Sequence, residues 1–250
     1  GILTAVIYVI GIIIWVKLQP GIAPDPKSEP KPTWGERFGA LGRTWELALL
    51  FGAVMGTIYF GVATATEAAA FGALIALIAV LRRRGRKLAV LEGLRETGTA
   101  TCSIFALVIG AGLFSLGLST TGFPAHLASL VAGLNLSQTG TIVLVLIPFM
   151  VLGCFVDGLS MILIMMPIVY PIVQSVGFDG VLFGLLVVKM IEIGAITPPV
   201  GLNVFVVKSM APNVELRDMF YGCMPFVMLE LMIVAMLIAF PQIALFALSD

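Results

Sequence analysis

The residues of this chain that are best suited to chemistry lie in two short interruptions of apolar sequence. GCFVDGLS, residues 153–160, contains a carboxylate and a hydroxyl, and EIGAITPPVGLNVF, residues 192–205, contains a carboxylate, two adjacent prolines and an asparagine. Pro198 and Pro199 lack backbone N–H groups and clash with a preceding helical turn, so they break a helix. We therefore expect the backbone to leave its helical hydrogen-bonding pattern at both places.

The proline pair predicts a site for ions. Because Pro198 and Pro199 donate no hydrogen bonds, the carbonyl oxygens around residues 194–197 lose their helical partners, and such oxygens are ligands for a hard cation such as Na⁺. A new helix that begins near Pro199 points free N–H groups and the positive end of its dipole toward the same place, which favours an anion. One interruption can therefore serve both a cation and an anion.

Four polar side chains near the interruptions each allow two interpretations. Asp157 is costly at mid-membrane, so it either serves function or accepts hydrogen bonds from the turn around it. Ser160 either offers its hydroxyl to a substrate or ion, or caps a helix. Thr197 and Asn203 either contact Na⁺ or a carboxylate, or satisfy the backbone groups that the prolines free.

Three further charged residues lie within or at the ends of apolar segments. Lys189 and Glu192 are three residues apart on one predicted helix and are expected to pair, because two unpaired buried charges would cost several kcal/mol each. The pair is either structural or takes part in ion coupling or substrate attraction. Glu67 begins an apolar run, where a carboxylate is expected to cap a helix.

The composition predicts an all-α integral membrane protein. Hydrophobic residues make up 60% of the 250 and charged residues 11%, with a mean hydropathy of +1.11, whereas soluble domains are roughly 45–50% apolar and 25% charged. Several apolar runs approach the roughly 20 residues that cross a bilayer as a helix. A net charge of zero argues against nucleic-acid binding. The three cysteines have unrelated spacings, so we expect neither a disulfide framework, a metal–thiolate site nor a cofactor.

The distribution of basic residues predicts the topology. Thirteen of the fourteen Lys and Arg residues fall in three connections, which the positive-inside rule assigns to the cytoplasm. The connections around residues 134–138 and 177–180 carry none and are expected outside. Between them, residues 139–176 form two apolar halves of about 15 residues, each reaching about 22 Å and so too short for a core of about 30 Å. A re-entrant hairpin that turns near residues 153–160 satisfies both constraints, and its tip is expected to line a site.

Three motifs together resemble the large membrane subunit (M, or DctM-like) of the tripartite ATP-independent periplasmic (TRAP) transporters. They are EIGAITPPVGLNVFV, GCFVDGLSMILIMMPIVYPIV and VATATEAAAFGAL. The resemblance covers nearly the whole chain, but only the C-terminal half of such a subunit. It implies an inverted-repeat fold in which this chain is one half, working as an elevator in the bacterial inner membrane. It also implies sodium-driven import of an organic acid anion, such as sialic acid or a C4-dicarboxylate. The implied partners are a periplasmic substrate-binding protein and a small four-helix membrane subunit.

The resemblance also assigns roles to residues and segments. It implies that the family's sodium and substrate contacts fall at the two interruptions, with Na⁺ near Gly194, Ile196, Thr197 and Asp157. The residues implied to contact sodium or substrate are Cys154, Phe155, Asp157, Ser160, Gly194, Ile196, Thr197, Pro199 and Asn203. The expected segments are a transmembrane helix that ends the preceding half (1–18), a cytoplasmic linker with an amphipathic surface helix (19–46), scaffold helices with a basic loop (47–96), a transport segment (97–212) and a C-terminal scaffold helix (213–250). Within the transport segment we expect a broken helix (97–133), a hairpin (139–176) and a discontinuous helix (181–210).

Two other functions fit the same residues less well. A sodium/carboxylate symporter that works without a binding protein shares the physical argument and differs in its partners. An intramembrane aspartyl enzyme would use Asp157 with a second carboxylate, for which Glu192 is the candidate, although Glu192 is expected to pair with Lys189.

Overall fold

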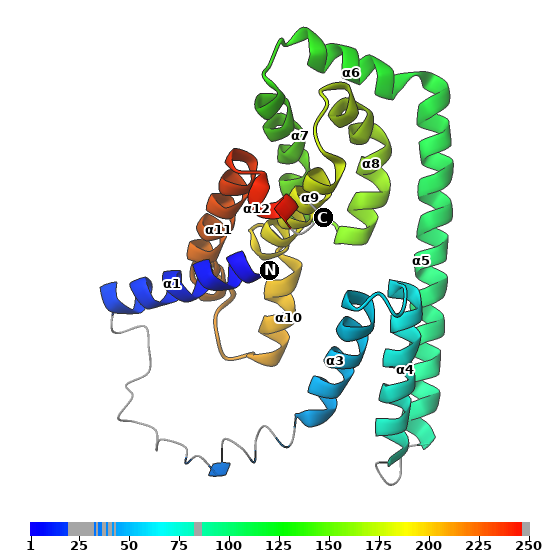
Figure 1. Ribbon diagram of the computed structural model, residues 1–250, viewed down its shortest axis with the longest axis vertical. Coiled ribbons are helices and arrows are strands. Elements are labelled where there is room, and N and C mark those ends of the chain that lie inside the picture. Colours follow the sequence, from blue (N-terminus) through cyan, green and yellow to red (C-terminus); the bar gives the residue numbers. More distant parts are fainter. Residues whose placement is uncertain are drawn as a thin grey trace. The chain divides into compact units, whose positions relative to one another are not determined.

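A computed structural model describes residues 1–19, 33, 35, 36, 39, 42, 44–82 and 87–246 (Figure 1). All regular structure within these residues is helical. The helices are α1 (Ile2–Leu18), α3 (Trp45–Tyr59), α4 (Ala65–Arg82), α5 (Lys87–Thr121), α6 (Phe123–Gly133), α7 (Gln138–Gly153), α8 (Gly158–Ser175), α9 (Gly180–Ile196), α10 (Leu202–Met210), α11 (Leu216–Ala239) and α12 (Gln242–Leu245). The all-α prediction is therefore confirmed for the described part of the chain. Four of these helices, α4, α5, α8 and α11, contain windows long and apolar enough to cross a membrane.

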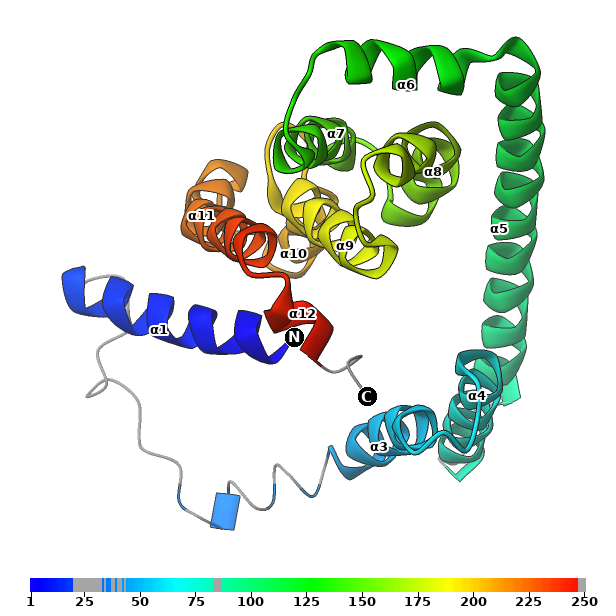
Figure 2. The same ribbon diagram turned by 45° about the horizontal axis from the view of Figure 1, so that its top comes forward.

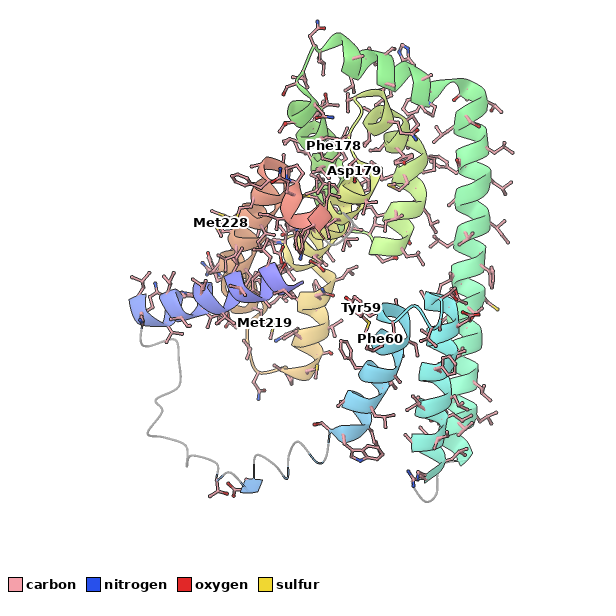
Figure 3. The ribbon with its side chains drawn as sticks, viewed as in Figure 1. Tyr59, Phe60, Phe178, Asp179, Met219 and Met228 are labelled. Carbon is pink, nitrogen blue, oxygen red and sulfur yellow. The ribbon has the colours of Figure 1, made fainter. Side chains whose placement is uncertain are left out.

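The chain divides into two compact units, residues 21–105 and residues 1–20 with 106–250. In the first unit, α3 and α4 pack against each other, with Gly72 so close to Val54 that a β-carbon at position 72 would lie 2.9 Å from its Cγ2. Tyr59 and Phe60 lie at the end of α3, and both side chains are largely exposed (Figure 3). Such exposed apolar side chains suit a lipid environment.

A capping box of Thr33 with Glu36 and a capping role for Glu67 were predicted in this unit, and the structure contains both. Thr64 and Glu67 begin α4: the Thr64 N–H and hydroxyl donate to Glu67 Oε2, each at 2.8 Å, and the Glu67 N–H faces Thr64 Oγ1 at 3.4 Å. Thr33 and Glu36 make the same reciprocal pair at 2.7 and 3.4 Å. The apolar face proposed for the surface helix, Trp34, Phe38 and Leu41, lies outside the described residues, and Trp45 is the first residue of α3.

The second unit is built around α9. Eight residues of α9 are buried, and α7, α8, α10 and α11 all contact it (Figure 2). The rings of Phe149 on α7 and Phe183 on α9 meet edge to face in the core, with their centroids 6.3 Å apart. α11 also packs against α1, and α6 packs against α8. α9 is therefore the central helix of this unit.

Three expected boundaries were wrong. α5 begins at Lys87, about ten residues before the expected start near 97. The polar stretch before residue 97 stays helical, and the hydroxyls of Thr97 and Thr99 donate hydrogen bonds to backbone carbonyls one turn earlier. Within the C-terminal segment the last span was expected from about Met224 to Phe246, with Pro225 near its end, whereas α11 begins at Leu216 and contains Pro225 in its interior. α8 has 18 residues, about 27 Å at 1.5 Å per residue, so it is longer than the half-span expected for the second arm of the hairpin.

The expected break after α5 is confirmed. α5 ends at Thr121, and Gly122 adopts a left-handed conformation with φ 69° before α6 begins, with Pro124 in its first turn. A side chain at position 122 would be strained in that conformation, so glycine suits the corner.

Candidate cation and substrate site

The first interruption separates α7 from α8 and is capped by its own side chains. α7 ends at Gly153, and α8 begins at Gly158 with Asp157 as its N-cap. Asp157 Oδ1 accepts the Ser160 N–H at 3.0 Å, and Oδ2 accepts a short hydrogen bond from the Ser160 hydroxyl. Ser160 is buried, whereas Asp157 is exposed. Both residues therefore perform the capping role that was one of their two interpretations, and the exposed carboxylate is still accessible to an ion.

The open ends of α7 and α8 lie side by side, as a hairpin requires. The Gln138 side-chain amide, at the start of α7, donates to the carbonyl of Val176, just after α8, at 3.0 Å. Ser137 caps α7 by accepting the Gly140 N–H at 3.2 Å. The chain thus leaves the hairpin next to the point where it enters, which is the geometry expected of residues 139–176. Phe178 and Asp179 form the turn that follows, where Asp179 caps α9 (Figure 3).

The second interruption separates α9 from α10 and leaves backbone carbonyls free. α9 ends at Ile196 and α10 begins at Leu202. Thr197 closes the end of α9 in two ways: its N–H donates to the Gly194 carbonyl at 3.1 Å, and its hydroxyl donates to the Ile193 carbonyl at 2.5 Å. In the described chain no hydrogen bond reaches the carbonyls of residues 195–197: Pro199 has no N–H for the carbonyl of residue 195, and the Gly201 N–H donates to Cys154 and not to residue 197.

The two interruptions touch each other through backbone. A β-carbon at Gly194 would lie 2.5 Å from the carbonyl carbon of Gly153 and 2.6 Å from its Cα. The Gly201 N–H donates to the Cys154 carbonyl at 3.3 Å, which ties the start of α10 to the hairpin tip. Gly201 itself has φ 60°, a conformation that favours glycine. The hairpin tip and the helix break are therefore one structural feature.

Three of the predicted site residues lie at this junction, and the others belong to the two interrupted segments and differ in exposure. Cys154 and Gly194 lie at the contact, and Thr197 closes the helix end beside it. Ile196 is partly buried, whereas Phe155, Asp157, Pro199 and Asn203 are exposed. Among the described residues, the Asn203 side chain makes no hydrogen bond, so its amide is free to contact a ligand. The structure thus brings backbone oxygens, an amide and a carboxylate to adjoining segments.

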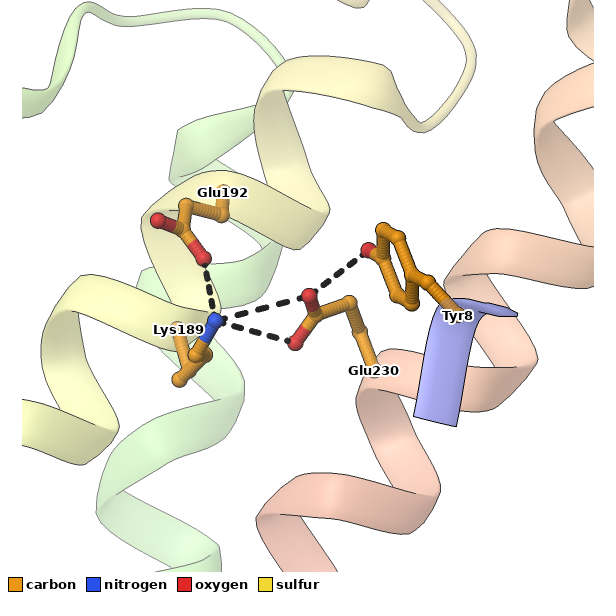
Figure 4. A network of polar contacts seen from close by, with 4 residues as sticks. All are labelled: Tyr8, Lys189, Glu192 and Glu230. Carbon is orange, nitrogen blue, oxygen red and sulfur yellow. Dashed lines mark hydrogen bonds and ion pairs between the residues drawn. The ribbon is translucent and has the colours of Figure 1, made fainter. Parts of the chain in front are cut away.

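The predicted pairing of Lys189 with Glu192 is confirmed, and two partners were missed. Lys189 Nζ lies 2.7 Å from Glu192 Oε2 and 3.4 Å from each carboxylate oxygen of Glu230 on α11 (Figure 4). The Tyr8 hydroxyl of α1 donates to Glu230 Oε1 at 2.6 Å. Glu230 could have been found as the carboxylate in the apolar part of this 24-residue helix, whose other carboxylate, Asp218, lies in the first turn; such a position makes it a functional candidate.

The chain is similar to known transporter proteins over nearly its whole length. The family described as the DctM component of the tripartite ATP-independent periplasmic transporters matches residues 1–243. The chain is 32% identical over 249 residues to the ectoine TRAP transporter large permease protein of Halomonas elongata, covering 98% of this chain and 57% of that protein. It is 31% identical over 248 residues to the C4-dicarboxylate large permease protein of Pseudomonas aeruginosa, covering 98% of this chain and 55% of that protein.

A third relative extends the range of named substrates. The sialic acid TRAP transporter large permease protein of Vibrio cholerae is 29% identical over 220 residues, which cover 86% of this chain and 51% of that protein. The chain thus spans about half the length of the curated relatives it matches. It belongs to the DctM family of TRAP transporter large permeases and, like them, is a multi-pass protein of the bacterial inner membrane.

Proposed function

We propose that this chain forms half of the translocation pathway of a sodium-coupled TRAP permease that imports an organic acid anion. The observation that carries the proposal is the junction of the hairpin tip with the α9–α10 break, where Gly153 meets Gly194 and the carbonyls of residues 195–197 have no hydrogen-bond partner in the described chain. Contacting interruptions of this kind are how secondary transporters form sites near the middle of the bilayer.

In this proposal the sodium ion binds first. The oxygens offered to it are the free carbonyls of residues 195–197, with Asp157 and the second lone pair of the Gly194 carbonyl as further ligands. A bound cation offsets the cost of bringing an anion into a low-dielectric site, so each ligand strengthens binding of the other. The anion would contact Asn203 and the N-terminal end of α10, whose N–H groups carry partial positive charge.

The contacts indicate which helices move together. α11 was expected in the scaffold, yet it shares the buried Lys189–Glu230 ion pair with α9 and lies in the same compact unit as the hairpin. Breaking a buried pair leaves an uncompensated charge at a cost of several kcal/mol, so a sliding boundary between α9 and α11 is unfavourable. We therefore place α11 with the hairpin and α9 in the moving part, and α3 and α4 in the scaffold.

The partners and the substrate follow from the family and are part of the proposal. A periplasmic binding protein would deliver the substrate, and a small membrane subunit would support the scaffold. The relatives are named for ectoine, C4-dicarboxylates and sialic acid, so these three are the first substrates to test.

The alternative functions differ in measurable ways. A symporter that works without a binding protein would take up free substrate, but the family match favours the tripartite arrangement. An aspartyl enzyme would need Glu192 as a second catalytic carboxylate, yet Glu192 is paired with Lys189, and the members of this family are transporter subunits.

The experiment is uptake into proteoliposomes that contain the intact permease and its small subunit. We expect uptake of a labelled substrate to require both an inward sodium gradient and the substrate-loaded binding protein. Equal uptake with potassium in place of sodium would contradict sodium coupling. Equal uptake of free substrate would instead favour the binding-protein-independent symporter.

A further inference from the structure

A polar cavity lies at the open end of the hairpin, away from the junction of the two interruptions. Its volume is about 370 Å³, and its walls come from the end of α6, the turn that follows, the start of α7 and the end of α8. Three polar side chains line it, those of Asn135, Thr141 and Ser175. Thr141 lies twelve residues, or about 18 Å of helix, before the end of α7 at Gly153. The cavity is therefore separate from the site proposed above.

Thr141 is the residue that indicates a ligand in this cavity. It is only 2% exposed, and within the described chain its hydroxyl makes no hydrogen bond. A buried hydroxyl without a partner costs free energy comparable to that of a lost hydrogen bond. The oxygen is not fully enclosed by protein atoms, and Thr141 lines the cavity, so the hydroxyl opens into it. Its hydrogen-bond partner or ligand must therefore come from the cavity.

The other two polar side chains offer hydrogen-bond acceptors. The Ser175 hydroxyl donates its proton to the carbonyl of Ile172 at 2.7 Å, so its oxygen can only accept from a ligand. The Asn135 side-chain nitrogen donates to the carbonyl of Gly133 at 3.4 Å, and its Oδ1 has no donor among the described residues. Together with Thr141, they supply three neutral side-chain oxygens to the cavity.

The charge distribution around the cavity favours a monovalent cation. α6 ends at Gly133 and α8 at Ser175, and the C-terminal end of a helix carries partial negative charge. The opposite charge at the start of α7 is partly offset, because Ser137 caps it by accepting the Gly140 N–H. Among the described residues, none that lines the cavity is Lys, Arg, His, Asp or Glu. A carboxylate or phosphate would therefore find no cationic partner, and Ca²⁺ would lack the carboxylates it prefers. Neutral oxygens are ligands for monovalent cations in channels and transporters.

We propose that this cavity is a second sodium site, formed by the oxygens of Asn135, Thr141 and Ser175. The choice of sodium rests on the proposed function, which couples uptake to this ion. The cavity of about 370 Å³ has room for roughly twelve water molecules at about 30 Å³ each, so the ion keeps part of its hydration shell. The connections beside the cavity, residues 134–138 and 177–180, carry no Lys or Arg and are expected outside. Sodium would thus reach this site from the outer side of the membrane.

The test is direct binding of radioactive sodium to the purified intact permease, without substrate. Thr141→Val keeps the size of the side chain and replaces the hydroxyl by a methyl group. We expect the dissociation constant of one bound sodium ion to rise at least about tenfold in this variant. Thr139→Val is the matched control, because it makes the same change on the same helix at a side chain that does not line the cavity. Equal sodium binding by Thr141→Val and the wild type would overturn the proposal and show that the cavity holds only water.

Ser175→Ala keeps the test decisive if Thr141→Val does not fold. It removes one acceptor from the opposite helix, so sodium binding at this site should weaken about threefold, and unchanged binding would overturn the proposal. Combining Thr141→Val with Pro199→Ala separates this site from the one at the α9–α10 break. The double variant should bind sodium more weakly than Pro199→Ala alone, and equal binding would mean that no second site exists. Uptake that needs no sodium would end the proposed function, but a loss of bound sodium in Thr141→Val would still stand, so the two proposals fail separately.

Discussion

The two chain interruptions differ in whether the backbone groups that they free from helical hydrogen bonds find a new partner. Between α7 and α8, the free N–H groups at a helix start are satisfied by a side chain, because Asp157 accepts from both the backbone and the hydroxyl of Ser160. Between α9 and α10, the carbonyls of residues 195–197 have no donor in the described chain, because Pro199 has no N–H and the chain leaves the helical path before Gly201, whose N–H donates to Cys154. The first interruption shapes the hairpin and the second keeps unsatisfied oxygens available. The free oxygens that the proposed sodium site needs therefore lie mainly at the second interruption.

The largest expected effect comes from separating the interruptions. In Gly194→Val the new β-carbon would lie only 2.5 to 2.6 Å from backbone atoms of Gly153, and backbone cannot move aside as a flexible side chain can. We expect a loss of stability on the order of 3 kcal/mol and loss of uptake. Thermal unfolding and proteoliposome uptake measure both.

Gly184→Ala on the same helix is the matched control for Gly194→Val. A β-carbon at position 184 meets nothing within 4 Å, so this change should leave stability unchanged or raise it by roughly 0.5–1 kcal/mol. If both variants behaved alike, close contact between the hairpin tip and α9 would not be the cause.

The next largest effect concerns the free carbonyls. Pro199→Ala restores an N–H group that can donate to the carbonyl of Ala195, four residues earlier, and so extend α9. We expect the sodium concentration for half-maximal uptake to rise about tenfold, equivalent to about 1.4 kcal/mol. Pro148→Ala, inside α7, restores an N–H group away from the break and serves as the control. An unchanged sodium dependence in Pro199→Ala would remove these carbonyls from the site.

Asp157 tests whether the first interruption also binds an ion. Asp157→Ala removes the cap of α8 and should cost about 1 kcal/mol of stability, whereas Asp157→Asn keeps an oxygen for the Ser160 N–H and removes only the charge. If the carboxylate is a sodium ligand, both variants weaken sodium dependence while only the alanine variant loses stability. Normal sodium dependence in Asp157→Asn would leave Asp157 with a capping role alone.

Local features of the site were predictable from the sequence. The two prolines fix where α9 must end, and the Lys189–Glu192 pair follows from a spacing of three residues on one helix. Asp157 and Ser160 were recognised as candidates, although their mutual hydrogen bonds decide only that they cap α8. Sequence patterns that span only a few residues were thus sufficient to locate the interruptions.

Features that depend on packing were not predictable. Glu230 is 41 residues from Lys189 in sequence, and its pairing requires knowing which face of α11 meets α9. The role of Gly194 is visible only once Gly153 lies against it. The early starts of α5 and α11 were missed because hydropathy marks where a helix is apolar, whereas the helical hydrogen bonds continue into polar sequence.

The smallest expected effect is at Glu67, which tests whether loss of a cap can imitate loss of a ligand. Like Asp157, Glu67 accepts hydrogen bonds at the start of an apolar helix, but it lies in the unit formed by residues 21–105. Glu67→Ala should lower the unfolding temperature slightly and leave the sodium concentration for half-maximal uptake unchanged, because Glu67 belongs to neither interruption. A sodium effect as large as that of Asp157→Asn would mean that a weakened helix start alone alters sodium dependence, and the contrast between the two interruptions would then lose its basis.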